Sequence, residues 1–184
     1  MPRPDRIQWT PDVATKHHIE VLNSAGVIPP DYQPAFNRTA EQFLNRAMPL
    51  FASADFQPIH GDCHRGNIIH RPGEGLFLVD FDDMAIGPVV QDLWMLLPGR
   101  PDDCDNEINW FLQGYNLFGD FPHSLFKLVP ALRGMRLIHF ASWCAVQSNE
   151  EHFKHHFPEW GKTRYWNELV KDLQEVIQDI VHRT

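Results

Sequence analysis

The chain has 184 residues, of which 43% are hydrophobic, and its 16 Lys and Arg against 24 Asp and Glu give a formal net charge of −8 at pH 7. This length and composition are typical of one globular domain, so we expect residues 1–184 to form a single domain. No run of basic residues interrupts the acidic balance, which argues against nucleic acids and anionic membranes as partners.

The cysteines and the N-terminus indicate the compartment. Cys63, Cys104 and Cys144 lie far apart and form no C-x-x-C pair, so we expect reduced thiols rather than a disulfide framework. The opening stretch MPRPDRIQWTP has no apolar signal-peptide core, and no apolar run reaches the ~18 residues of a membrane span. We therefore expect a cytoplasmic protein without a membrane segment.

Helical patterns dominate the chain on both sides of its middle. Thr10 and Pro11 predict the start of a helix that runs to about Leu22, and apolar residues at three- and four-residue steps predict a second helix over residues 39–51. Further helical patterns are VVQDLWMLL, EINWFLQGYNLF, PALRGMRLIHFASWCAVQ and TRYWNELVKDLQEVIQDIVHR. The pattern beginning PALRG is apolar almost all round and predicts a buried central helix.

The segment at residues 59–83, IHGDCHRGNIIHRPGEGLFLVDFDD, contains the one convincing β pattern. Two short apolar runs flank the turn residues at positions 72–75, which is typical of a β-hairpin. The predicted fold class is therefore mainly α with one small β-hairpin.

Oxygen-bearing side chains lie at the open end of this hairpin. Asn67 opens the first strand and Asp80 closes the second, so we expect them side by side, with Asp62 in the loop just upstream. Amide and carboxylate oxygens suit Mg²⁺, and a carboxylate that does not bind the metal can accept a proton from an attacking hydroxyl. The spacing from Asp62 to Asn67 is that of the kinase pattern H-R-D-x-x-x-x-N, which indicates a site for Mg²⁺ and ATP.

At these residues the sequence resembles a known family. HGDCHRGNII and LVDFDD resemble the motifs of the aminoglycoside phosphotransferase and choline kinase superfamily. Together with GPVVQDLWMLL and LRGMRLIHFASW they resemble the stress-response kinase A family of bacterial Ser/Thr protein kinases, from about residue 35 to near the C-terminus. The resemblance implies a protein-kinase-like C-terminal lobe. Residues 59–83 would carry the catalytic loop and metal-binding hairpin, residues 88–184 a helical subdomain, and residues 1–35 a peripheral segment.

The resemblance also implies roles for individual residues. Asp62 is then the catalytic base, and Asn67 and Asp80 hold Mg²⁺. His60 braces the loop, and the helix carboxylate of Asp92 accepts hydrogen bonds from the loop backbone.

Other polar and aromatic residues leave alternatives open. Asp82 either contacts the metal directly or orients the residues that do so. His64 either supports the site or is a hydrogen-bonded structural imidazole. The histidines of EHFKHHFPEW, which are His152, His155 and His156, have spacings that can bind Zn²⁺, but no further ligands accompany them. We expect a solvated surface there. Trp94, Trp110, Trp143, Trp160 and Trp166 are expected in packed interiors.

The implied reaction transfers the γ-phosphoryl group of ATP to a hydroxyl, with Ser or Thr of a protein as the acceptor. A small-molecule kinase acting on aminoglycosides, choline or homoserine is an alternative, as is a non-catalytic kinase-like binding module. Upstream of His60 the only glycine is Gly26 and the only lysine is Lys16. The Gly-rich loop, strand Lys and helix Glu of an N-terminal β-rich lobe are therefore absent. We expect a longer parent to supply that lobe, and this chain to be inactive alone.

Overall fold

The structure is a computed structural model that describes residues 6–183, apart from the side chain of Arg183. The described residues form two compact units: unit 1 holds residues 6–9 and 53–129, and unit 2 holds residues 10–52 and 130–183. The single domain expected from the sequence stays a prediction. None of the described helices is long and apolar enough to cross a bilayer.

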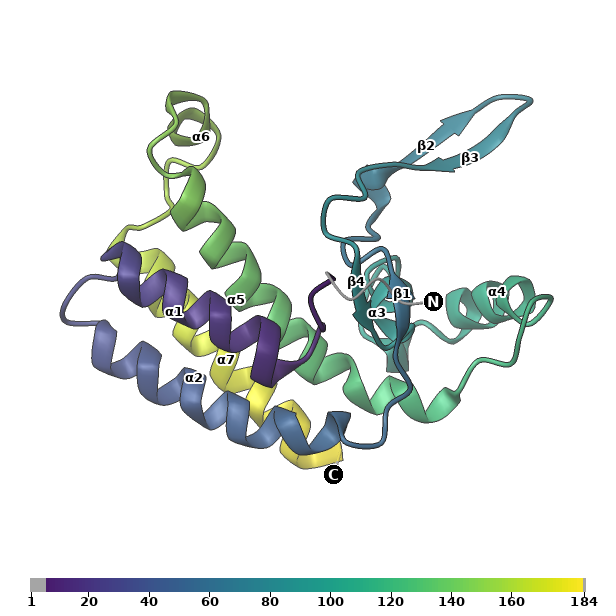
Figure 1. Ribbon diagram of the computed structural model, residues 1–184, viewed down its shortest axis with the longest axis horizontal. Coiled ribbons are helices and arrows are strands. Elements are labelled where there is room, and N and C mark those ends of the chain that lie inside the picture. The colour runs from purple at the N-terminus through teal and green to yellow at the C-terminus, as the bar shows by residue number, and fades with distance from the viewer. Residues whose placement is uncertain (1–5, 184) are drawn as a thin grey trace. The chain divides into compact units, whose positions relative to one another are not determined.

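Unit 1 combines short strands with short helices (Figure 1). Its strands are β1 (Gln57–Ile59), β2 (Ile68–Arg71), β3 (Gly75–Leu78) and β4 (Ala85–Gly87), and its α-helices are α3 (Val90–Trp94) and α4 (Asp105–Tyr115). Single 3₁₀ segments lie at Arg65–Asn67, Pro101–Asp103 and His123–Leu128.

The predicted hairpin is confirmed. β2 and β3 pair antiparallel, with a register that runs from Ile68 opposite Leu78 to Arg71 opposite Gly75. Gly73 and Gly75 both have positive φ, a backbone conformation that glycine adopts without a steric penalty. The turn residues at positions 72–75 therefore set where the chain reverses.

A second sheet corrects the expectation that the hairpin is the only β structure. β1 pairs antiparallel with β4, with Pro58 opposite Ile86, and the N–H of Trp9 donates a hydrogen bond of 2.8 Å to the carbonyl of Ile86. Each strand has only three residues, which is too short for an alternating pattern to be visible in the sequence.

Unit 2 is helical. It contains α1 (Lys16–Ala25) after a π-helical turn (Pro11–Thr15), α2 (Gln33–Ala47) before a 3₁₀ turn (Met48–Phe51), nearly all of α5 (Val129–Gln147), α6 (Glu151–His156) and α7 (Thr163–Arg183). The first helical segment begins at Pro11 as predicted and ends at Gly26, whose φ is 63°. α2 begins at Gln33 rather than near residue 39, because Pro34 fits the first turn of a helix, where its missing N–H breaks no bond.

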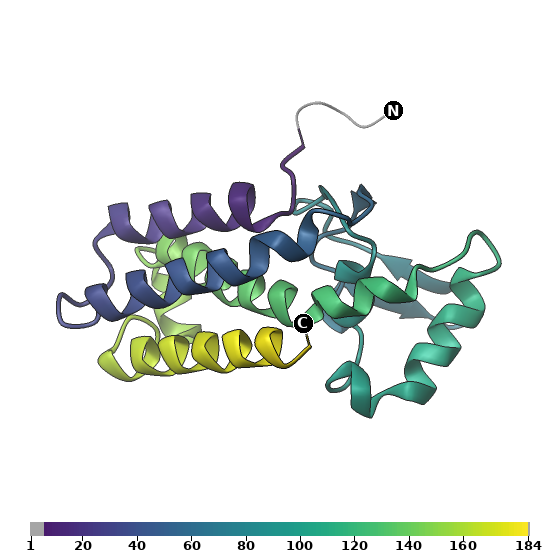
Figure 2. The ribbon, with the colours of Figure 1, turned by 90° about the horizontal axis from the view of Figure 1, so that it is seen from below.

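Close packing joins the long helices of unit 2, which lie side by side in Figures 1 and 2. Phe36 of α2 meets Trp166 of α7 edge to face, with ring centroids 5.9 Å apart. A Cβ atom at Gly134 of α5 would lie 2.3 Å from the ring of Phe43, so glycine allows this close approach of α5 to α2. Trp166 confirms the expected burial of a tryptophan.

The expected burial of α5 holds on one face only. Leu132, Met135 and Ile138 are buried, whereas Trp143 is 43% exposed and Val146 is exposed. Trp110 of α4 is exposed as well, so the tryptophans do not all lie in packed interiors. An apolar pattern shows that a side chain can be buried, but the packing of other segments decides whether it is.

Candidate active site

The loop at His60–Asp62 is held by the side chain of Asp92 on α3. One carboxylate oxygen accepts the backbone N–H of His60 at 2.7 Å, and the other accepts the backbone N–H of Gly61 at 3.0 Å. Burial raises the pKa of the Asp92 carboxyl, and these two N–H groups oppose the shift. The structure places Asp92 where the resemblance expects it, while its role in a reaction stays a prediction.

Gln91 is a member of this arrangement that sequence reasoning missed. Its fully buried side chain donates a hydrogen bond of 2.9 Å to the carbonyl of Gly61 and accepts one of 3.0 Å from the indole N–H of Trp94. A polar residue next to Asp92 in an otherwise apolar helix was the available signal, because buried amides are nearly always hydrogen-bonded.

Gly61 is required for the loop to turn here. Its φ is +86°, and a Cβ atom at this position would lie 2.2 Å from the backbone oxygen of Asp83. Both the dihedral angle and the close approach exclude a side chain. The backbone just before Asp62 is thereby packed against the segment that follows Asp80.

His60 joins the loop to the strand end that precedes Asp80. Its Nε2 lies 2.9 Å from the carbonyl oxygen of Val79, and because a carbonyl only accepts, Nε2 carries the proton in this bond. The imidazole also packs on Phe81, with ring centroids 4.8 Å apart. His60 is buried, so this bond restrains the loop against the end of the hairpin.

Asn67 connects the loop to the hairpin. The side-chain nitrogen of Asn67 donates a hydrogen bond of 3.0 Å to the backbone carbonyl of Asp62. The backbone carbonyl of Asn67 accepts a hydrogen bond of 3.0 Å from the N–H of Val79. Asn67 is only 9% exposed. Because the amide nitrogen is engaged, the amide oxygen is the atom that Asn67 offers to a cation.

Asp80 has an unusual backbone. Its φ of 64° is the only positive φ of a non-glycine residue in the described part of the chain. Such a conformation costs a non-glycine residue about 1–2 kcal/mol, and strain of this kind is concentrated at functional sites. The Asp80 side chain is exposed.

His64 faces Asp62. Its Nδ1 accepts the N–H of Gly66 at 2.9 Å, so the neutral imidazole carries its proton on Nε2, which lies 3.6 Å from a carboxylate oxygen of Asp62. This contact is too long for a hydrogen bond, and it becomes an ion pair when the imidazole is protonated. The geometry is compatible with both interpretations of His64.

Two further residues of this segment are Asp82, which the sequence predicts to act near the metal, and Cys63, which follows Asp62. Asp82 is exposed, and the structure describes no hydrogen bond or ion pair of its side chain. Cys63 is buried, and burial, followed by the negative charges of Asp92 and Asp62, raises the pKa of its thiol to about 11. Such a thiol is not a reactive thiolate at neutral pH.

The donor set fits a magnesium ion that is shared with a substrate. No group of three or more His, Cys, Asp or Glu side chains within residues 6–183 is arranged to hold a metal by itself. Mg²⁺ usually takes one or two protein carboxylates and completes its shell with water and substrate phosphates. The carboxylate of Asp80 and the amide oxygen of Asn67 are a ligand set of this kind. The histidines His152, His155 and His156 are exposed and belong to no such group either.

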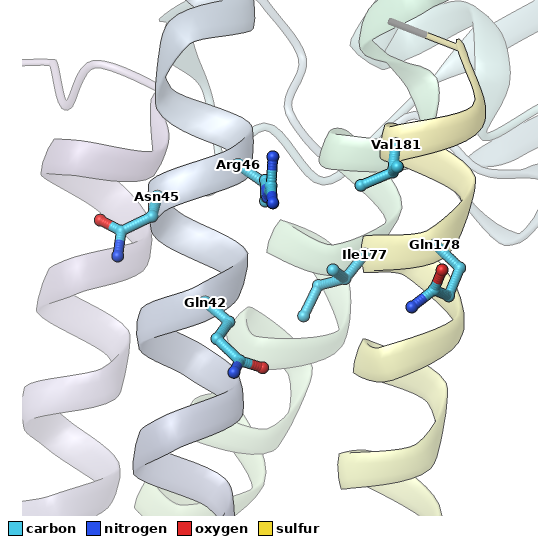
Figure 3. Close-up of a pocket in the computed structure, with 6 residues that line it drawn as sticks. All are labelled: Gln42, Asn45, Arg46, Ile177, Gln178 and Val181. Atoms are coloured by element: carbon cyan, nitrogen blue, oxygen red, sulfur yellow. The ribbon is translucent and has the colours of Figure 1, made fainter.

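A separate groove in unit 2 lies between α2 and α7 and has a volume of about 640 Å³. Figure 3 shows its lining residues, which are Gln42, Asn45, Arg46, Ile177, Gln178 and Val181. None of these side chains is a carboxylate, thiol or hydroxyl, so the groove has no group to act as a base or nucleophile.

The sequence profile of the phosphotransferase enzyme family (APH) matches residues 3–126. This span includes the loop, the hairpin and α3, which carry the contacts described above. The chain belongs to the phosphotransferase enzyme family. Its relatives within bacteria include Stress response kinase A of Salmonella paratyphi A, which is 30% identical over 164 residues, covering 86% of this chain and 49% of the relative. Serine/threonine protein kinase RdoA of Salmonella typhimurium shows the same identity and coverage.

This phosphotransferase family chain spans about half the length of these relatives. Among solved structures, the amicoumacin kinase hAmiN in complex with AMP-PNP, Ca²⁺ and Ami matches with a TM-score of 0.63 and 15% identity, over 97% of this chain and 53% of the kinase. The likeness shows a shared fold. The predicted fold class, mainly helical with a small hairpin and kinase-like, is confirmed.

Proposed function

We propose that this chain provides the catalytic loop of an ATP-dependent phosphotransferase that moves the γ-phosphoryl group of ATP to a hydroxyl group. Membership of the phosphotransferase enzyme family supports the reaction class, and the kinase names of the relatives agree with it. Because the chain spans about half of those relatives, the activity is proposed for a protein in which a nucleotide-binding lobe completes the site.

One observation supports the proposal most strongly: the bonds of Asn67 bring the loop and hairpin together. The Asn67 side chain holds the backbone of Asp62, and the Asn67 backbone holds Val79, whose neighbour Asp80 has positive φ. Two hydrogen bonds of 3.0 Å thus link the backbones of Asp62 and Val79 through Asn67, and Asp80 directly follows Val79. A polar turn that only connects two strands would not need this restraint.

In the proposed reaction, Asp62 accepts the proton of the acceptor hydroxyl. The hydroxyl oxygen attacks the γ-phosphorus, the bond between that phosphorus and the β,γ-bridging oxygen breaks, and ADP leaves with its electron pair. Asp92, through the N–H groups of His60 and Gly61, fixes the backbone that presents Asp62. Positioning of this kind provides much of the catalysis in phosphoryl transfer.

Asn67 and Asp80 are the residues that would hold Mg²⁺, which when bound neutralises charge on the phosphates. Asp82 would help to orient these two ligands without binding the metal itself. The proposal places the protein in the cytoplasm, where ATP and Mg²⁺ are available and thiols are kept reduced.

We propose Ser or Thr of a protein as the acceptor, on the basis of the relatives' names alone. The test uses the protein encoded by the complete open reading frame, with γ-labelled ATP and Mg²⁺. A Ser/Thr peptide mixture, kanamycin, choline and homoserine are offered in parallel. Label in the peptides alone would support a protein as the acceptor. Label in one of the small molecules would instead identify that molecule as the acceptor and overturn the proposed protein acceptor.

The same assay tests the role of Asp62. Asp62→Asn should lower transfer by about a hundredfold or more, as loss of a general base does, whereas Asp55→Asn, a change at an exposed carboxylate before β1, should not. Transfer by Asp62→Asn within about tenfold of the wild type would remove Asp62 from this role. No transfer to any acceptor by the wild type would favour a binding module.

A further inference from the structure

An aromatic pocket of about 530 Å³ lies in unit 2 and is lined by residues of α5, of α6 and of the positions next to α6. Its walls include the rings of Trp143 on α5 and of Phe153 on α6, with Phe157 just after α6. Asp62 and Asn67 belong to the other unit, and none of the residues with a role in the proposed phosphoryl transfer lines this pocket. Its volume lies within the roughly 300–1,000 Å³ range of small-molecule sites.

The three rings form a preformed cluster. Phe153 stacks on Phe157 with centroids 4.9 Å apart, and Trp143 meets Phe153 and Phe157 edge to face at 6.0 and 6.1 Å. Phe153 is 6% exposed, whereas Trp143 and Phe157 are 43% and 37% exposed. Exposed aromatic surface around a hollow is a feature of binding sites rather than of ordinary protein surface.

The polar groups at the rim favour a donor or a cation. His156 Nδ1 lies 2.9 Å from the carbonyl oxygen of His152, so Nδ1 carries the proton and Nε2 of the neutral ring remains an acceptor. Gln147 adds an amide. In this rim only the carboxylate of Glu150 carries a fixed charge.

Glu150 is available to a ligand. Its side chain does not cap α6, and none of the described residues forms an ion pair or hydrogen bond with its carboxylate. The adjacent Glu151 differs, because it pairs with Lys154 at 3.2 Å. The one lysine of α6 is thereby already engaged by a carboxylate other than that of Glu150.

We propose that this pocket binds a small molecule in which a short chain joins an aromatic ring to a primary ammonium group. The ring packs against Trp143, Phe153 and Phe157. The ammonium group donates to the Glu150 carboxylate and lies against an aromatic face, where the ring quadrupole attracts a cation. The α2–α7 groove, which has Arg46 and no aromatic ring, does not have this chemistry.

The test is a titration of the isotope-labelled chain followed by amide NMR shifts, with probes that share a ring and chain length. 2-Phenylethylamine should shift residues of α5 and α6 and bind about tenfold more tightly than 3-phenylpropionate, because only the amine complements Glu150. Absence of shifts in α5 and α6, or equal affinity for amine and carboxylate, would overturn the proposal.

Two matched variants separate the charge from the fold. Glu150→Gln should weaken amine binding about five- to tenfold, and Glu151→Gln, a change of the same kind one residue away, should leave it unchanged. Trp143→Leu should weaken the binding of both probes, and circular dichroism checks that this variant folds. If Trp143→Leu does not fold, Phe157→Leu is used in its place. Equal effects of Glu150→Gln and Glu151→Gln would contradict the proposed contact.

Discussion

The side-chain amide of Asn67 donates a hydrogen bond of 3.0 Å to the backbone carbonyl of Asp62. The bond spans five residues and closes the loop between the proposed base and the first strand of the hairpin. In Asn67→Asp, the donor becomes an oxygen that faces the carbonyl oxygen, so the bond is lost and replaced by repulsion.

We therefore expect Asn67→Asp to lower the free energy of unfolding by about 1–3 kcal/mol, the cost of leaving a buried polar group unsatisfied. Urea unfolding followed by circular dichroism measures this change. Hydrogen exchange of the loop amides at residues 61–67 should become faster. The exposed Asn37→Asp on α2 serves as the control, and equal effects of the two substitutions would contradict a specific role for the Asn67 bond.

Because Asp80 has a positive φ, two substitutions at this position can distinguish its effect on folding stability from its effect on metal binding. Glycine accepts φ near 64° without penalty and alanine does not, so Asp80→Gly should be more stable to urea than Asp80→Ala by about 1 kcal/mol. Both variants should lose Mg²⁺-dependent binding of ATP in the complete protein, because both lack the carboxylate. Calorimetric titration that finds unchanged affinity in both variants would exclude Asp80 as a metal ligand.

His18 predicts a dependence of stability on pH. Burial, followed by the nearby imidazoles of His139 and His17, lowers the pKa of His18 to about 3, and its Nδ1 lies 3.2 Å from the Ser142 hydroxyl. The unfolded state, with a pKa near 6.5, binds the proton more readily than the folded state. Stability from this group is therefore complete above about pH 6.5 and is lost as the pH falls below it.

Between pH 6 and 4.5 the wild type should lose up to about 1.4 kcal/mol per pH unit more than His18→Gln. Urea unfolding at a series of pH values measures the difference. His70→Gln, at an exposed position on β2, should keep the pH dependence of the wild type. Parallel pH profiles of wild type and His18→Gln would show that the imidazole is not buried in its neutral form.

The 184-residue chain by itself should fold but transfer no appreciable phosphate. Its sequence upstream of His60 has no Gly-rich loop or strand lysine, and loss of that clamp on the triphosphate should cost on the order of a thousandfold or more in rate. The measurement is label transfer from γ-labelled ATP beside the Asp62→Asn control. Asp62-dependent transfer by the chain alone would show that these residues form a complete active site.

The amino-acid sequence alone determined the local features of this protein. The β2–β3 hairpin follows from turn residues between two apolar runs, and the candidate site could be predicted because Asp62, Asn67 and Asp80 lie within one short segment. Such features depend on chain neighbours, whose spacing constrains where the side chains can lie.

Only the tertiary structure decided the contacts between distant segments. Gln91 lies 30 positions from the Gly61 carbonyl to which its side chain donates, and β1 pairs with β4 although the whole β2–β3 hairpin lies between them in the sequence. The apolar pattern of α5 likewise did not show that Trp143 would be exposed beside Phe153 and Phe157. Burial and long-range hydrogen bonds depend on which segments pack together, and no local pattern specifies that choice.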